Sequence, residues 1–215
     1  MVKLDQINAV LIANQVNLSI FTQLWLVENN VIHKDEFTQE AFFTPMAVNI
    51  KTPKFAFLVI PDRIQVSIDG GPEGSLDILK RTLGKVSELL PHTPYQALGF
   101  NYVYTVQLPP QGSLEKSSQT LFMKLEGLFK DEFSSSDARF GIYLSKTVSG
   151  ARLRLEIKPA TENKSGAEVL IAAFNFQRDL KSPGDISAMI DSWETHLHSS
   201  DKLANALNSR LEGKK

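Results

Sequence analysis

The sequence contains no cysteine, which excludes disulfide bonds, thiolate metal sites and thiol nucleophiles. It also has no apolar run near the ~20 residues that a helix needs to cross a bilayer, so we expect no membrane association. Neither sign of charge dominates, because 23 lysines and arginines face 24 aspartates and glutamates. A net charge of -1 gives no global field that attracts nucleic acid, so nucleic acid is not an expected partner of the chain as a whole. With no recognisable signal segment, a cytoplasmic protein is expected.

Signatures of known active sites are missing too. There is no Gly-x-Ser-x-Gly nucleophile elbow, and Gly84-Lys85 lacks the earlier glycine that a phosphate-binding P-loop requires. The glycine-rich stretch 70–75 opens a helix, but Asp69, Glu73 and Asp77 surround it and disfavour an anion. We therefore expect no cofactor and no catalytic residue, and we lean against an enzyme.

The histidines do not form a recognisable metal site. His196 and His198 lie two residues apart on a predicted helix, so their side chains point in different directions. Asp191 and Glu194 share one helical face with His198, but solvated helix faces carry such sets routinely. We predict no metal site.

The order of hydrophobic residues indicates the fold. A chain of 215 residues can bury a large core, and we expect a single domain over 1–215. Strict alternation, as in Ile64, Val66 and Ile68, predicts antiparallel strands, whereas apolar residues three and four apart predict amphipathic helices. The expected fold is α+β, with a mostly antiparallel, curved sheet, helices on one face and a long C-terminal helix.

The expected elements follow from these patterns. Predicted strands cover 5–13, 47–52, 55–68, 96–108, 140–144, 151–157 and 167–178. Predicted helices cover 17–29, 75–90, 114–132 and 183–211, with Asn17 and Ser75 as N-caps, and 159–166 is expected to be a loop. The stripe of the last helix is expected to pack on the sheet, because Ser200 and Ala204 weaken a free-standing seam; a dimer seam through Trp193 is the alternative.

One N-terminal segment is more apolar than a single helix face allows. Residues 18–31 carry eight large apolar side chains, which cannot all face one core. Surplus apolar surface on a protein usually marks a binding patch, and Trp is enriched in binding hot spots. We predict a partner-binding surface at Phe21, Leu24 and Trp25. The alternative is that Phe42, Phe43 and Met46 cover this segment.

Two other sites are weighed against this one. Tyr102 and Tyr104 on one strand, with Trp193 on the last helix, could line a cavity for a small apolar ligand, although core packing is the simpler interpretation.

The second site is a basic strand face. Arg139, Arg152, Arg154 and Lys158 could contact single-stranded nucleic acid, but Glu156 interrupts the stripe. A solvated strand face is the simpler interpretation.

Three short motifs resemble a sporadically distributed family of uncharacterised bacterial proteins. They are Ala97-Leu98-Gly99-Phe100-Asn101-Tyr102, Ile60-Pro61-Asp62-Arg63 and Leu197-His198 in the closing helix. The resemblance implies no activity, and it favours a bacterial or phage origin. The expected function is that of an interaction or assembly subunit of a bacterial or phage complex, whose partner is another protein or a second copy of this chain. A binder of a small apolar ligand and an unrecognised enzyme are the alternatives.

Overall fold

A single antiparallel sheet organises the chain. The computed structural model describes residues 1–110, 112–122, 132–162, 165–182 and 184–213. Nine strands pair in the order β2-β3-β4-β5-β1-β6-β9-β8-β7, and the sheet does not close on itself, so β2 and β7 are its edges. The strands are β1 (Val2–Ala13), β2 (Phe42–Phe43), β3 (Val48–Lys51), β4 (Phe55–Ile60), β5 (Arg63–Ile68), β6 (Tyr95–Gln107), β7 (Ile142–Val148), β8 (Ala151–Thr161) and β9 (Glu168–Asp179).

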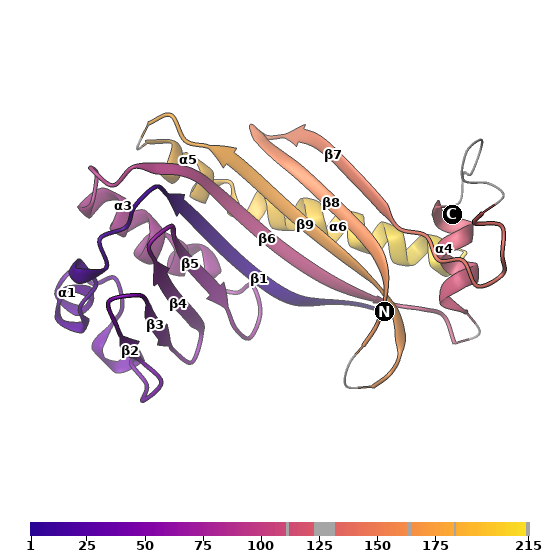
Figure 1. The fold of residues 1–215 in the computed structure, drawn as a ribbon, viewed down its shortest axis with the longest axis horizontal. Helices are drawn as coiled ribbons and strands as arrows, with labels where there is room; N and C mark the ends of the chain where they lie inside the picture. The colour runs from indigo at the N-terminus through magenta and orange to yellow at the C-terminus, as the bar shows by residue number, and fades with distance from the viewer. Residues whose placement is uncertain (111, 123–131, 163–164, 183, 214–215) are drawn as a thin grey trace.

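Helices cover one side of this sheet. In Figure 1, α3, α5 and α6 lie behind the strands, and α6 follows the long strands over most of their length. The helical segments are η1 (Leu18–Ile20), α1 (Gln23–Glu28), η2 (Lys34–Glu36), α2 (Ser75–Leu79), η3 (Lys80–Gly84), α3 (Lys85–Leu89), α4 (Leu114–Phe122), α5 (Gly184–Asp191) and α6 (Trp193–Leu211). The predicted α+β fold, with its antiparallel sheet and long C-terminal helix, is confirmed. No described helix has the length and apolar character needed to cross a bilayer.

The two faces of the sheet differ in chemistry because side chains alternate along each strand. On β8, Leu153 and Leu155 are buried on the side that carries α6, which we call the helix face. Arg152 and Arg154 point to the opposite side, the open face. The sequence pattern therefore decides which side of the sheet is packed and which meets solvent.

Amide side chains cross the middle of the sheet. Asn101 Nδ2 donates to Asn8 Oδ1 at 2.7 Å, and Asn175 Nδ2 donates to Asn101 Oδ1 at 2.8 Å. These three residues occupy paired positions on β1, β6 and β9. The row extends the cross-strand pairing from the backbone to the side chains.

Large aromatic side chains pack together where α6 crosses β6. The Trp193 ring lies 4.7 Å from the Phe100 ring and 5.1 Å from the Tyr102 ring, between centroids. Trp193 Nε1 donates to Ser75 Oγ at 2.8 Å, which joins α2 to the start of α6. The indole is fully buried, and its N–H has the partner that burial demands.

The predicted helix 17–29 is wrong as a single element. Asn17 does cap a helix, but only the short η1, because its Oδ1 accepts from the Ser19 amide at 3.2 Å. The backbone then leaves the helix at Phe21, and Thr22 caps α1 by accepting from the Trp25 amide. Because the two capping residues, Asn17 and Thr22, are five residues apart, the chain forms two short helices instead of one. Phe21 lies at the break between them and is buried in the core.

The predicted helix 183–211 is also interrupted. It is divided at Ser192, whose hydroxyl and amide both bond to the Met189 carbonyl, at 2.6 and 3.1 Å. A serine that competes for backbone carbonyls loosens a helix at that point, and α6 begins with the next residue.

Three smaller expectations change as well. Ser75 is not the N-cap of α2, because Gly74, with φ of 71°, occupies that position. The Ser75 hydroxyl instead accepts the hydrogen bond from Trp193 Nε1. The expected loop 159–166 is shorter, because β8 continues to Thr161 and Pro159 still pairs with Leu170. Of the predicted helix 114–132, the structure shows α4 as far as Phe122, and residues 123–131 lie outside the described part.

Candidate functional site

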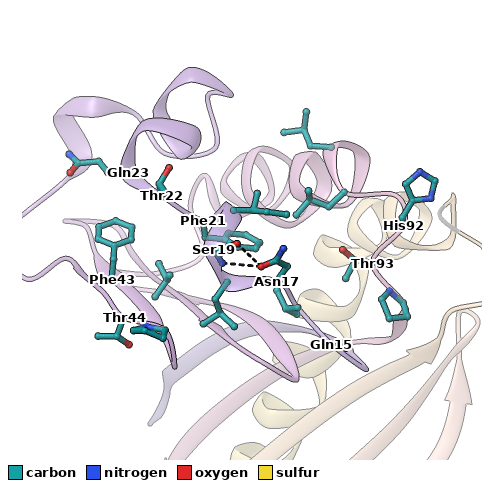
Figure 2. Close-up of a pocket in the computed structure, with 18 of the residues that line it drawn as sticks. Gln15, Asn17, Ser19, Phe21, Thr22, Gln23, Phe43, Thr44, His92 and Thr93 are labelled. Atoms are coloured by element: carbon teal, nitrogen blue, oxygen red, sulfur yellow. Dashed lines mark hydrogen bonds between the residues drawn. The ribbon is translucent and has the colours of Figure 1, made fainter.

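The segment after β1 forms a tight, well-anchored turn at one end of the molecule. Asn17 Oδ1 accepts from both the amide and the hydroxyl of Ser19, at 3.2 and 2.7 Å, which closes the turn (Figure 2). Phe21 is only 1% exposed, and its ring lies 5.5 Å from Trp25 and 6.4 Å from Phe57. Because this buried ring fixes the turn to β4, the residues on either side of it are held at the surface.

A broad groove lies beside this turn. It has a volume of about 1120 Å³ and is bounded by residues of 15–23, the β2–β3 hairpin and the α3–β6 connection. Figure 2 shows side chains of all three segments around the same space. The turn with Asn17 and Ser19 lies in the middle of the view, Phe43 lies to one side of it, and His92 lies to the other. We call it the apolar groove.

Among the described residues that line the apolar groove, none is a lysine, arginine, aspartate or glutamate. Its polar members are amides and hydroxyls such as Gln15 and Thr44, and His92 is its one titratable residue. Its apolar members come from all three walls: Val16, Leu18, Ile20, Phe21, Phe43, Pro45, Val48, Leu89, Leu90, Pro91 and Pro94.

Exposed apolar side chains gather around the same groove. Among the described residues, ten large apolar side chains are highly exposed; Phe43 and Leu89 line the groove, and Leu24 and Met46 are next in sequence to the lining residues Gln23 and Pro45. Phe42 is exposed too, but as the strand neighbour of Phe43 it faces the other side of the sheet. Leu24 and Met46 are 66% and 72% exposed, and of the other exposed apolar residues Leu144 and Leu203 lie beside a smaller hollow formed by β7, β8 and α6. This gathering is typical of an interaction surface.

The three residues predicted to bind a partner occupy different positions here. Phe21 forms part of the floor of the apolar groove, Trp25 is half-buried, and Leu24 projects into solvent from α1. As for the alternative cover, Phe43 lines the groove together with Phe21, Phe42 and Met46 are exposed outside the lining, and Leu24 stays 66% exposed.

From the sequence, Phe42 and Phe43 were considered only as residues that cover segment 18–31, and their exposure at the protein surface was not predicted. The signal that could have identified them is their adjacency, because neighbouring residues on a strand face opposite sides and cannot both reach one core. Leu89 was missed for a different reason. It follows the last core position of the predicted helix, where the chain turns toward Pro91.

The suggested ligand cavity is filled by packed side chains. Tyr102, Tyr104 and Trp193 are buried, the Tyr102 hydroxyl bonds to the Trp193 carbonyl at 3.2 Å, and the Tyr104 hydroxyl donates to Asp201 Oδ1 at 2.7 Å. Burial raises the pKa of both tyrosines. The polar atoms that would orient a ligand are already used, so the geometry gives no support to a cavity at these residues.

The basic strand face is divided by ion pairs. Arg139 turns away and bonds to Glu115 at 2.7 Å and Glu168 at 2.8 Å, and Lys158 lies 3.5 Å from Glu156. Arg152 and Arg154 lie together near the start of β8, beside a separate hollow. The four predicted residues therefore do not form one continuous stripe.

Comparison with known proteins adds no relative. No family model matches the chain and no curated protein matches it, so the resemblance to the bacterial family rests on its three short motifs alone.

The histidines of α6 behave differently from each other. His196 is fully buried, and both ring nitrogens lack a hydrogen-bond partner. Burial lowers the pKa of His196, so the neutral ring is favoured. Asp191 is paired with Lys80 at 2.9 Å. Within the described ranges, no group of three acidic or histidine side chains could hold a metal ion.

Proposed function

We propose that the chain is a non-enzymatic interaction or assembly protein that binds an apolar segment of another protein in the apolar groove. The observation that carries this proposal is the coincidence of the uncharged groove with the exposed side chains of Phe43 and Leu89 in its lining and of Leu24 and Met46 beside it.

The size of the groove supports a peptide segment over a small molecule. Pockets for small ligands usually have volumes of roughly 300 to 1,000 Å³ and enclose most of the ligand. The apolar groove, at about 1120 Å³, is larger and is formed by three loop segments open to solvent. An extended or helical stretch of a partner can lie along it, whereas a small ligand would stay largely hydrated.

The chemistry of the lining also restricts the partner. A charged side chain placed in the groove would lose hydration and gain no ion pair, because the lining offers no charge of either sign. Amides such as Gln15 and Gln23 can bond to the partner backbone. The expected partner segment is therefore uncharged and apolar.

Two substitutions test the proposal on the native complex. The full chain is purified from its source with co-eluting proteins, which are identified by mass spectrometry, and the complex is then rebuilt from the purified components. Leu24→Ser and Phe43→Ser should each weaken binding by roughly tenfold or more, since truncated hot-spot residues cost more than about 1.4 kcal/mol. Thermal stability should change little, because exposed apolar residues contribute little to folding.

Tyr143→Ser provides the matched control. Tyr143 is 63% exposed on β7, at the opposite edge of the sheet, so its loss removes a similar apolar surface without touching the groove. Binding that is lost equally in this variant would overturn the proposal. So would groove variants that bind normally. If the only co-eluting protein is the chain itself, light scattering of the two groove variants identifies a second copy as the partner.

A further inference from the structure

A second hollow lies at one end of β8 and β9, away from the apolar groove, and is lined from the open face and from the start of α5. It has a volume of about 510 Å³ and lies where β8 begins and β9 ends. Its lining comes from the β7–β8 turn, the outward side chains of β8 and the segment that leads into α5: Thr147, Gly150, Ala151, Arg152, Arg154, Gln177, Arg178, Asp179, Lys181 and Asp185. We call it the basic hollow.

The backbone places two arginines side by side in the basic hollow. Ser149 and Gly150 both have positive φ, 48° and 79°, which is the geometry of a tight hairpin turn. Arg152 and Arg154 follow on β8 and share the open face because they are two residues apart. Gln177 lies across from Arg152 on β9, and its Oε1 accepts from Arg154 Nη1 at 3.2 Å.

The charges of the lining do not balance. Four cations and two carboxylates surround the basic hollow, which leaves an excess of two positive charges. Asp185 is already used, because it pairs with Arg178 at 3.1 Å and accepts the amides of Lys181 and Ser182 at 2.9 Å.

Three cations and one carboxylate therefore remain. They are Arg152, Arg154 and Lys181, against Asp179, which accepts from Gln177 Nε2 at 3.5 Å. In the described part of the chain, neither Arg152 nor the Lys181 ammonium makes an ion pair. An unpaired guanidinium beside a second one is favourable when an anion lies between them.

We propose that the basic hollow binds the phosphate monoester group of a small ligand. A monoester carries close to two negative charges at neutral pH, which matches the excess of two positive charges in the lining. The planar forks of Arg152 and Arg154 suit phosphate oxygens, and the Lys181 ammonium adds a point charge.

The remaining lining restricts the rest of the ligand. Ala151 is the only apolar residue among the lining residues, so no acyl chain or ring is buried there. The Asp179 carboxylate disfavours a second anionic group and can accept a hydrogen bond from a hydroxyl. The ligand is thus a phosphate monoester on a hydroxylated skeleton, and glycerol 3-phosphate is a simple probe with this chemistry.

Isothermal titration of the full chain with glycerol 3-phosphate tests the site. Arg152→Ala and Arg154→Ala should each weaken binding by about tenfold to a hundredfold, as expected for loss of one charge-assisted hydrogen-bonding group. Arg152→Gln, which keeps a polar side chain of similar length, should weaken it as well. Circular dichroism checks that each variant remains folded, and at least one of these surface variants is expected to do so.

Lys158→Ala is the control, because Lys158 lies on the same strand and face but outside the hollow. Its binding should equal that of the native protein. An equal loss in this variant would show diffuse attraction and overturn the proposal, as would the absence of binding in the native protein.

A phosphate monoester can be free or can be a lipid headgroup. Flotation with phosphatidylcholine vesicles, with and without phosphatidic acid, separates these sources. Binding only to glycerol 3-phosphate supports a soluble ligand, and binding to the phosphatidic acid vesicles through the same arginines supports a headgroup. Tighter binding of single-stranded DNA, whose phosphates are diesters, overturns the monoester site.

Discussion

The imidazole of His196 stacks on the ring of Phe176, with 4.4 Å between centroids and 26° between the planes. The stacking is part of the packing of α6 on the sheet, and Phe100 lies 6.0 Å from the same imidazole. A histidine held between aromatic rings, with both nitrogens unbonded, is stable there only as the neutral ring.

This arrangement predicts a pH-dependent stability. The pKa of His196 is lowered below 6.5 by burial, so the unfolded chain binds a proton more readily than the folded one. The free energy of unfolding should therefore be highest above about pH 6.5 and should fall as the pH drops toward about 5. Urea denaturation across this range measures the effect.

The contribution of His196 is isolated by comparison with two variants. His196→Phe should flatten this part of the pH profile, because phenylalanine stacks but does not titrate. Leu203→Ala, at a partly exposed position on the same helix, removes no titratable group and should keep the slope of the native profile. An unchanged slope in His196→Phe would assign the pH dependence to other groups.

Trp193→Ala should lower the free energy of unfolding by about 3 to 5 kcal/mol, the range for a large truncation in a core. The reason is its full burial against Phe100 and Tyr102. Leu203→Ala, at a partly exposed position on the same helix, should cost less than about 1 kcal/mol. A folded Trp193 variant that is merely monomeric, where the native protein is a dimer, would instead assign the helix to a dimer seam.

Ser75→Ala should cost about 1 to 3 kcal/mol, because it leaves the buried Trp193 N–H without an acceptor. In a Trp193→Phe background the same change should cost less, since no N–H is left unpaired. Ser87→Ala is a suitable control, because that hydroxyl donates to the Gly84 carbonyl three residues earlier in the chain and does not join distant segments. Additive effects in the double variant would contradict the prediction.

Arg81 and Glu36 form a two-bond ion pair, with distances of 2.6 and 2.7 Å, that fastens η2 to η3. Burial acts to raise the pKa of Glu36, but the hydrogen bonds from Arg81 and from the His33 amide outweigh it, so the pKa is lowered. The pair should therefore stabilise the fold above about pH 4.5, and this contribution should be lost as the pH falls through the lowered value.

Arg81→Met should cost about 1 to 2 kcal/mol at neutral pH, because both side chains are only 20% exposed. The cost should shrink in acid, where the Glu36 carboxylate is protonated. Urea denaturation near pH 7 and near pH 3.5 gives both values. The exposed pair of Lys51 and Glu40 is the comparison, and Lys51→Met should change stability little at either pH.

The periodicity of the long strands and helices could be read from the sequence, but which strands pair with each other could not. The alternation in 63–68 and 151–157 predicted strands and their buried sides, because burial on one face imposes a two-residue period. Strand order was beyond reach, since β1 lies between β5 and β6 through contacts distant in sequence. Helix breaks at Phe21 and Ser192 were missed because both segments keep an apolar pattern across the break.

The candidate site was predictable only in part. The apolar excess of 18–31 pointed to the end of the molecule where the apolar groove lies, because too many large side chains competed for one face. The far walls of the groove come from 43–48 and 89–94, which meet that segment only in the folded chain. The basic hollow was partly visible as Arg152 and Arg154, whereas Lys181 and Gln177 join them through pairing of β8 with β9.

The order of strands in the sheet has a consequence for synthesis on the ribosome. β6 pairs with β1 on one side, but its other neighbour, β9, emerges only some sixty residues later. The helix face of β6, with Phe100, Tyr102 and Tyr104, stays uncovered for longer still, because α6 follows β9 in the chain. Until then the nascent chain presents a long unpaired edge and an uncovered aromatic surface, which is the state that chaperones recognise and that aggregates when release is slow.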